Sequence, residues 1–219
     1  MRKLSISAFL VATLLVSGSL SAARKKRQAS ASPVFSYYVL ALSWAPDFCA
    51  QTGAPKDPGE CGPGKKLGFV VHGLWPQGDT GRGPENCGSA SPVSQSIVQI
   101  MLNYIPTASL IQHEWKTHGT CSGLSVADYF AALRKARDMV TIPAEFKAPT
   151  QTLKLSPPAL EAAFTAANPA YRALAFRTSC TNGTLQEVRV CFSKDLFPQA
   201  CTSSAGECPL SSIAILPVK

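Results

Sequence analysis

Apolar residues follow two kinds of pattern along this chain, and each kind predicts a different element. Runs that are wholly apolar, or that alternate apolar with polar residues, are typical of strands. They predict strands at residues 37–44, 67–72, 185–192 and 212–216. The second run ends at Gly73, so we expect its strand to stop at His72.

Other segments place apolar residues three or four positions apart, a spacing that predicts helices. Helices are predicted at residues 92–105, 111–118, 126–140 and 156–167. Ser156 is a good cap for the last of them, and Gly119 stops the second. Segments 49–66 and 77–92 are rich in Gly, Pro or charge and predict loops. Because strands and helices do not alternate strictly, we expect an α+β fold with a mainly antiparallel central sheet and flanking helices.

The amino terminus has the pattern of an export signal. Arg2 and Lys3 precede an uncharged apolar run at residues 4–20, and small residues follow at 21–23. The run is short for a membrane span, which needs about 20 apolar residues. We therefore expect residues 1–23 to be a signal peptide, with an uncleaved amino-terminal anchor as the alternative.

The rest of the chain is expected to form a flexible basic lead-in at residues 24–33 and one domain at 34–219. No later segment is apolar and long enough to span a membrane, so we expect a secreted or periplasmic protein. The formal net charge of +8 comes largely from the amino terminus, because from Gln28 onward fifteen Lys and Arg face thirteen Asp and Glu. The charge alone therefore does not indicate a nucleic-acid-binding protein, because such proteins are usually more basic.

Eight cysteines support export. An even number in an exported chain predicts a fully paired disulfide framework, although spacing alone leaves the pairing open. The alternative is a cytosolic zinc protein. No two cysteines form the Cys-x-x-Cys spacing that is usual in structural zinc sites, so we expect a single disulfide-linked domain.

Only three histidines occur, and all lie in two short segments, residues 69–76 and 113–121. Glu114 and His118 stand four residues apart, so on a helix they share one face. His72 lies at the end of its predicted strand, where a cleft commonly begins. Two histidines from different elements that face one cleft can accept and donate protons in the same reaction.

A zinc hydrolase is the first alternative, because His113 precedes Glu114. A metalloprotease helix carries its two histidines four residues apart. His113 and His118 are five apart, which separates them by about 140° around a helix. We therefore predict no metal site and no cofactor.

The two histidine segments resemble the active-site segments of the ribonuclease T2 family, and the resemblance extends from Tyr37 to Cys208. It implies a secreted endoribonuclease that acts on single-stranded RNA with low base specificity, and we expect a monomer. The implied reaction is a metal-free transphosphorylation. A base takes the proton of the ribose 2′-hydroxyl, the oxygen attacks the adjacent phosphorus, and an acid protonates the departing 5′-oxygen. The product carries a 2′,3′-cyclic phosphate.

The resemblance also implies residue roles. His118 corresponds to the base of the first step and His72 to the acid. Glu114 corresponds to a residue that supports the phosphate and the proton transfers, and His113 to one that holds the phosphate. Trp75 corresponds to a residue that stacks on a base, a contact that tolerates any sequence. Without the resemblance, the residues do not indicate which histidine is the acid and which is the base.

Two positions depart from the family pattern. Many relatives carry lysine immediately before the second catalytic histidine, where this chain has Thr117, and its lysine stands one residue earlier at Lys116. Adjacent helical residues point about 100° apart, so Lys116 points in a different direction from a lysine at position 117, and we keep it as a candidate substrate contact, together with Gln77. Gln77 stands where some relatives carry an aspartate linked to base choice. Base preference therefore stays open. Thr117, together with the low net charge of the chain from Gln28 onward, motivates an alternative function: an RNA-binding or toxin-like protein of the same fold with weak catalysis.

The family pattern implies four disulfide pairs as well. The implied pairs are Cys49–Cys61, Cys87–Cys121, Cys180–Cys208 and Cys191–Cys201. The second of these would tie the loop that follows the first histidine segment to the end of the catalytic helix.

Overall fold

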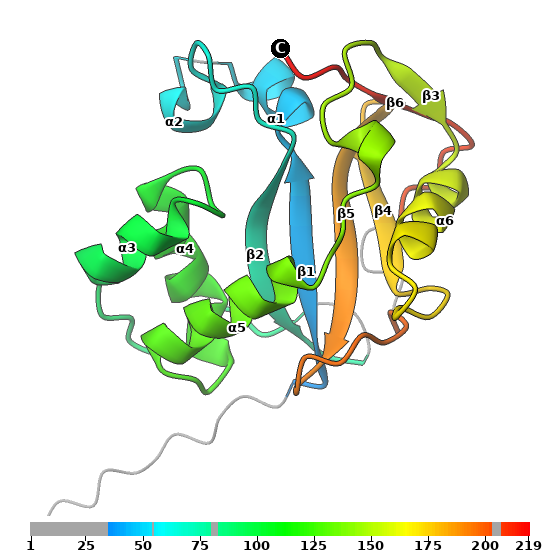
Figure 1. The fold of residues 1–219 in the computed structure, drawn as a ribbon. Helices are drawn as coiled ribbons and strands as arrows, with labels where there is room; N and C mark the ends of the chain where they lie inside the picture. Colours follow the sequence, from blue (N-terminus) through cyan, green and yellow to red (C-terminus); the bar gives the residue numbers. More distant parts are fainter. Residues whose placement is uncertain (1–34, 54, 80–82, 203–206) are drawn as a thin grey trace, which may run out of the picture. The chain divides into compact units, whose positions relative to one another are not determined.

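A six-stranded sheet runs through the middle of the computed structural model, which describes residues 35–53, 55–79, 83–202 and 207–219 (Figure 1). Its order is β2-β1-β5-β6-β3, and β4 also pairs with β5, on the edge opposite β1. The strands are β1 (Tyr37–Trp44), β2 (Phe69–Gln77), β3 (Leu153–Leu155), β4 (Phe176–Thr181), β5 (Thr184–Ser193) and β6 (Ile213–Ile215). Only β5 and β6 pair in parallel among the described strands. The expected α+β fold with a mainly antiparallel sheet is confirmed.

Helices flank the sheet on two sides. In Figure 1, α3, α4 and α5 gather beside β2, whereas α6 lies along β4. The helices are α1 (Ala45–Thr52), α2 (Pro58–Cys61), α3 (Gln95–Met101), α4 (Ala108–Thr117), α5 (Val126–Asp138) and α6 (Pro157–Ala167), with 3-10 turns at Gly119–Cys121 and Ala144–Phe146. Within the described part of the chain, none of these helices has the length and apolar character needed to cross a membrane. The predicted signal peptide and lead-in lie outside the described residues.

Strand β1 is the centre of the core. Seven of its eight residues are buried, because β2 and β5 cover its edges and helices cover its faces. Leu40, Leu42 and Trp44 are fully inaccessible to solvent, and the indole of Trp44 donates a hydrogen bond to the carbonyl of Leu216 at 3.0 Å. A strand buried on both faces shows a continuous apolar run, which is why the sequence pattern identified its bounds correctly.

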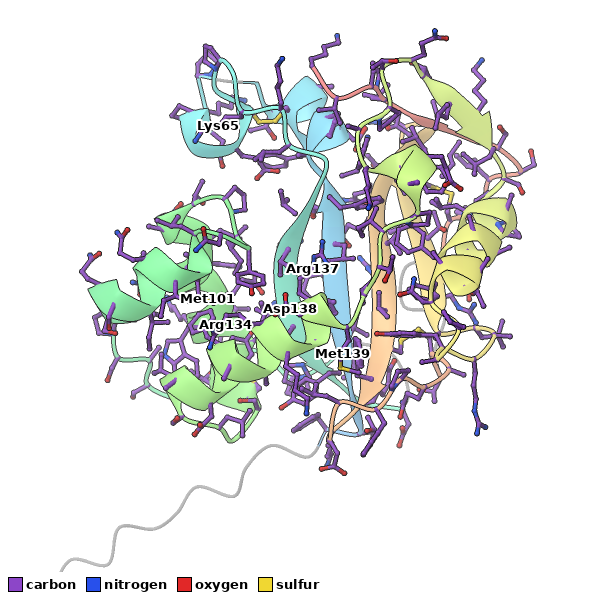
Figure 2. All side chains as sticks on the ribbon, viewed as in Figure 1. Lys65, Met101, Arg134, Arg137, Asp138 and Met139 are labelled. Carbon is purple, nitrogen blue, oxygen red and sulfur yellow. A yellow bond between two sulfur atoms is a disulfide. The ribbon has the colours of Figure 1, made fainter. Side chains whose placement is uncertain are left out.

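Helices α5 and α6 also match their predictions, because local chemistry specifies where each begins. The side chains of Ser125 and Ser156 accept hydrogen bonds from the backbone amides of Asp128 and Ala159, in the first turn of each helix. Arg134 and Arg137 lie along α5, as expected for its polar positions (Figure 2).

Three expectations about local structure were wrong. The segment at 49–66 is not wholly a loop, because α1 runs into it and α2 lies within it. Proline in the first turn is compatible with a helix, and Pro46 lies in the first turn of α1. The helix predicted at 92–105 is shorter than expected, at Gln95–Met101. Strands β3 and β4 were missed, since both are short and β4 is rich in polar residues.

Four disulfides link these elements, and they are the same four pairs that the family resemblance implies. They join Cys49 to Cys61, Cys87 to Cys121, Cys180 to Cys208, and Cys191 to Cys201. Among the described residues no cysteine is free.

Candidate active site

His72 occupies a β-bulge in the middle of β2. The pairing of β1 with β2 sets Ala41 opposite Gly73 and Leu42 opposite Val71, so His72 has no partner residue on β1. The expectation that the strand ends at His72 was therefore wrong, since β2 continues to Gln77. A bulge bends the strand and re-aims the extra side chain, which is how a histidine within a sheet comes to face a functional site.

Helix α4 supplies the second group of site residues. It begins at the cap residue Thr107, and its buried face carries Glu114, which is fully inaccessible to solvent. His118 is the residue that ends the helix, and its backbone amide still donates to the carbonyl of Glu114 at 3.0 Å. Glu114 and His118 therefore come from the same side of α4, as their spacing predicted.

Trp75 lies close to both histidines. Its ring centroid lies 5.1 Å from that of His72, in an edge-to-face arrangement, and 5.4 Å from that of His118. Its indole nitrogen donates a hydrogen bond to Oε2 of Glu114 at 2.9 Å. The other carboxyl oxygen, Oε1, lies 3.7 Å from Nε2 of His72. The structure thus brings together four residues that the sequence singled out from two separate segments.

Glu114 is placed to change its protonation state near neutral pH. Burial raises the pKa of its carboxyl to about 7, although the nearby His72 charge and the Trp75 hydrogen bond act in the opposite direction. Its Oε1 atom is buried and has no hydrogen-bond partner among the described residues. A buried polar atom without a partner is costly, so this oxygen is available to a polar group of a bound molecule.

The two histidines are shifted in opposite directions. Burial lowers the pKa of His118 to about 4, with help from the neighbouring charges of His72 and His113. Burial also acts to lower the pKa of His72, but the hydrogen bond and charge of Glu187, together with the charge of Glu114, outweigh it and raise that pKa. At neutral pH, His118 can accept a proton and His72 can donate one.

Glu187 on β5 is a site residue that the sequence analysis missed. Its Oε1 lies 2.7 Å from Nδ1 of His72, although the two residues are 115 positions apart in the chain. In the sequence it is one polar residue in an alternating strand, where an exposed side chain is expected. Its burial, with 3% exposure, depends on strands that pair only in the folded chain.

A cavity of about 310 Å³ adjoins the histidines. Both His72 and His113 line it, together with apolar side chains such as Phe48. Glu60 also lines it, and burial together with the negative charge of Asp57 raises the pKa of Glu60 to about 7. The exposed His113 thus borders the site through this cavity.

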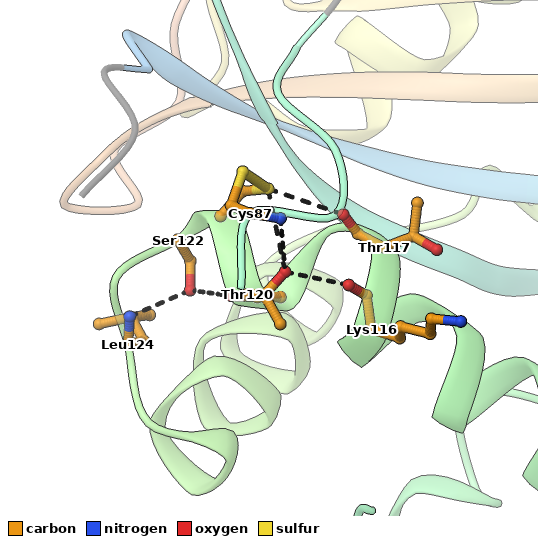
Figure 3. The surroundings of a disulfide bond; sticks show 8 residues. Cys87, Lys116, Thr117, Thr120, Ser122 and Leu124 are labelled. Atoms are coloured by element: carbon orange, nitrogen blue, oxygen red, sulfur yellow. Dashed lines mark hydrogen bonds between the residues drawn. A yellow bond between two sulfur atoms is a disulfide. The ribbon is translucent and has the colours of Figure 1, made fainter. Parts of the chain in front are cut away.

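Lys116 and Thr117 lie on different faces of α4. Thr117 is buried and follows Glu114 by three residues, so it shares the face of Glu114. Lys116 is exposed, and Figure 3 shows its side chain extending away from the loop of Cys87. Gln77 is the last residue of β2, two residues beyond Trp75 and on the same side of the strand.

The disulfide between Cys87 and Cys121 holds a loop against the end of α4 (Figure 3). The backbone amide of Cys87 donates to the hydroxyl of Thr120 at 3.2 Å, and the amide of Asn86 donates to the carbonyl of Thr117 at 2.7 Å. Because His118 lies within this clamped segment, the bridge restricts the backbone that carries it. In the parts of the chain that the structure describes, no three His, Cys, Asp or Glu side chains cluster as a metal site would require.

The family model described as the ribonuclease T2 family matches residues 35–201. Similar curated proteins include a ribonuclease of Aeromonas hydrophila, 40% identical over 120 residues, which make up 55% of this chain and 52% of that protein. A probable ribonuclease of Haemophilus influenzae is 33% identical over 119 residues, or 49% and 44% of the two chains. The chain therefore spans about half the length of the curated relatives that it matches.

Solved structures share the fold. An RNase-related protein from Calystegia sepium matches with a TM-score of 0.64 and 24% identity, over 84% of this chain and 98% of that chain. The structure of RNase NT in complex with 5′-AMP matches with a TM-score of 0.62 and 20% identity, over 84% and 99%. At these identities the likeness speaks for the fold alone.

Proposed function

This chain belongs to the ribonuclease T2 family, and from that premise we propose that it is an endoribonuclease that cleaves single-stranded RNA by transphosphorylation. The observation that carries the proposal is the pair of histidines that both pack near Trp75 and have opposite pKa shifts. One proton acceptor and one proton donor are what this reaction requires.

In the proposed first step, the unprotonated ring of His118 takes the proton of the ribose 2′-hydroxyl. The oxygen attacks the adjacent phosphorus, and the bond from phosphorus to the 5′-oxygen breaks. The protonated His72 supplies the proton that the departing oxygen needs. The upstream RNA fragment ends in a 2′,3′-cyclic phosphate, and the two histidines have exchanged protonation states.

Glu114 and Trp75 are proposed to position the substrate. A protonated Glu114 donates a hydrogen bond to a phosphate oxygen, and its pKa of about 7 makes that form accessible at neutral pH. The half-buried ring of Trp75 offers a face on which a base stacks. His113 is proposed to hold the phosphate from the cavity rim, and Gln77 to contact a base. DNA lacks the 2′-hydroxyl, so it should not be cleaved.

The export proposal rests on the amino-terminal pattern together with the disulfides. Four disulfides fit an oxidising compartment outside the cytoplasm. We propose a secreted or periplasmic monomer whose partner is RNA and that needs neither metal nor cofactor.

The test is incubation of the purified, oxidised protein with a defined RNA and its matching DNA in EDTA. RNA fragments with 2′,3′-cyclic phosphate ends, and intact DNA, are expected. Inhibition by EDTA would instead support a metal-dependent hydrolase. Intact RNA from acidic to neutral pH would contradict the proposal and favour the RNA-binding alternative, whose basis is Thr117 at the usual position of lysine.

Alanine variants separate catalysis from binding. Replacing His72 or His118 by alanine should lower turnover by about 10²- to 10⁴-fold, the usual contribution of a general acid or base. Affinity for RNA should be nearly unchanged. If affinity and turnover fell together, both histidines would be binding groups and the proposed roles would be wrong.

A further inference from the structure

The strongest contact of His72 is with a buried carboxylate that comes from another strand. Oε1 of Glu187 lies 2.7 Å from Nδ1 of His72, which is shorter than the 3.7 Å from Nε2 of His72 to Oε1 of Glu114. A hydrogen bond from a ring nitrogen to a carboxylate determines which ring nitrogen carries the proton. With Nδ1 engaged by Glu187, the reactive nitrogen is Nε2, on the side of Glu114.

Glu187 is itself held in place through both of its oxygens. Nε of Arg189 donates a hydrogen bond to Oε2 at 2.9 Å, and Nη2 of Arg189 forms an ion pair with the same oxygen at 2.9 Å. The hydroxyl of Ser43 donates to Oε1 at 3.3 Å. Burial acts to raise the pKa of Glu187, but the hydrogen bonds and charges of His72 and Arg189 outweigh it and lower that pKa. The carboxylate therefore stays negative and has little freedom to turn.

The hydrogen bond between His72 and Glu187 reaches across the intervening strand β1 because that strand carries a small side chain at this point. Glu187 lies opposite Ser43 of β1, and Ser43 lies opposite Val70 of β2. Two strand spacings amount to roughly 9.5 Å, a gap that a histidine and a glutamate can close only over a small residue. Because His72 lies in the bulge, strand pairing does not fix the orientation of its ring. The hydrogen bond to Glu187 fixes it instead.

We propose that Glu187 is a positioning residue for His72: it holds the imidazole with Nδ1 protonated and Nε2 toward the substrate. This inference rests on the proposed function, in which His72 donates a proton to the departing 5′-oxygen. Glu187 takes no part in bond making. It acts through His72, and Arg189 acts through Glu187.

Several charged groups face His72 besides Glu187. Glu114 on α4 and Arg189 on β5 act on its pKa directly. The charge of His72 in turn acts to lower the pKa of Glu60 on α2 and the pKa of His118 at the end of α4. Removal of Glu187 leaves the opposing charge of Arg189 in place, so the preference of His72 for its charged form should fall.

The first experiment is an NMR titration of the histidine rings in the folded protein with Glu187→Gln and Glu187→Ala. Only three histidines occur in the chain, so their signals can be assigned by single His variants. The pKa of His72 should fall by about one unit or more in both variants, in the range that loss of a neighbouring opposite charge produces. The ring ¹⁵N shifts should also show that neutral His72 carries its proton on Nδ1 in the native chain, and that it is a mixture of the Nδ1 and Nε2 tautomers in Glu187→Ala.

The control is Glu145→Gln, which removes one negative charge from an exposed position on the 3-10 turn at Ala144–Phe146. It should leave the His72 titration unchanged. An unchanged His72 pKa and tautomer in folded Glu187→Gln would overturn the proposal. This readout does not depend on turnover, so it holds even if the chain proves inactive on RNA.

The second experiment compares kcat, KM and the pH profile. Glu187→Gln should lower kcat at neutral pH by about 10- to 100-fold, a typical cost of losing a partner that orients a functional histidine. KM should change little, and the alkaline limb of the profile should move to lower pH while the acid limb stays. If KM rose and the alkaline limb stayed, the role of Glu187 would be structural and the proposal would be wrong. If the native protein formed no 2′,3′-cyclic phosphate product from RNA, that result would instead contradict the proposed function.

Discussion

The indole nitrogen of Trp75 on β2 donates a hydrogen bond to Oε2 of Glu114 on α4, at 2.9 Å. This contact joins the two segments that contain all three histidines, 39 residues apart in the chain. Glu114 is fully buried, so the bond also supplies one of the few partners of its carboxyl group. Trp75 is thus a structural link of the site, besides its proposed role as a stacking surface for a base.

Trp75→Phe tests that link. It keeps an aromatic face but leaves Oε2 of Glu114 without its donor, which should cost about 1–3 kcal/mol in the free energy of unfolding. The pKa of Glu114 should rise further, since this hydrogen bond favours the charged form. Urea unfolding and ¹³C NMR of the glutamate carboxyls measure the two effects.

Trp115→Phe is the matched control for that substitution. The indole nitrogen of Trp115 is buried without a hydrogen-bond partner among the described residues, so its loss removes no such bond. The pKa of Glu114 should stay unchanged in this variant. An equal rise in both variants would show that packing, and not the Trp75 hydrogen bond, controls Glu114.

Gly73→Ala should disrupt the site from within β2. A Cβ at this position would collide with Oε2 of Glu114 and come within 2.5 Å of Nε1 of Trp75. Because Glu114 is enclosed, relief of the collision should cost about 1–3 kcal/mol of stability and displace the carboxyl group. Turnover of RNA and thermal unfolding check both effects.

Gly88→Ala serves as the control, since nothing lies within 4 Å of a Cβ there. Its stability and turnover should match those of the native chain. Full activity in Gly73→Ala would mean that the position of Glu114 is less critical than its burial implies.

The rate of RNA cleavage should depend on pH through both histidines. His118 must be unprotonated to act as the base, so kcat/KM should rise with pH through a pKa of about 4. His72 must be protonated to act as the acid, so the rate should fall as pH exceeds its raised pKa, above the usual 6.5. A profile measured at constant ionic strength checks both limbs.

Glu114→Gln tests whether the acid and alkaline limbs of the pH–rate profile come from the histidines and not from the titration of Glu114. The amide does not ionise, so the acid limb near 4 should remain, whereas the alkaline limb should move to lower pH as a negative charge beside His72 is lost. A shift of the acid limb alone would reverse the assignment of acid and base.

Thr117→Lys should raise turnover. Thr117 shares the face of Glu114 on α4, so a lysine there can extend its amine toward a phosphate at the site. An added positive charge at a developing negative charge should raise kcat by at least about tenfold, given the 10²- to 10³-fold cost of losing such a group. Steady-state kinetics on a dinucleotide substrate measures the change.

Lys116→Ala is the control for that gain. Lys116 is exposed on another face of the helix, so its loss should leave kcat nearly unchanged. A large fall in kcat for Lys116→Ala would show that Lys116 already fills the role of the absent lysine.

The sequence by itself determined the elements whose causes are local. Strand β1 followed from one apolar run, and α6 from a capping serine followed by prolines, because caps and periodicity act over a few residues. It also singled out His72, Glu114 and His118, since their residue types and spacing carry the chemistry. The family resemblance added the disulfide pairs, which spacing could not.

Only the tertiary structure decided how these groups act. The bulge at His72 arises from pairing between strands, and Glu187 reaches His72 across 115 residues of chain. The opposite pKa shifts of His72 and His118 come from burial and from charges that folding brings close. Burial and long-range contact have no local signature, so the difference between the two histidines exists only in the folded protein.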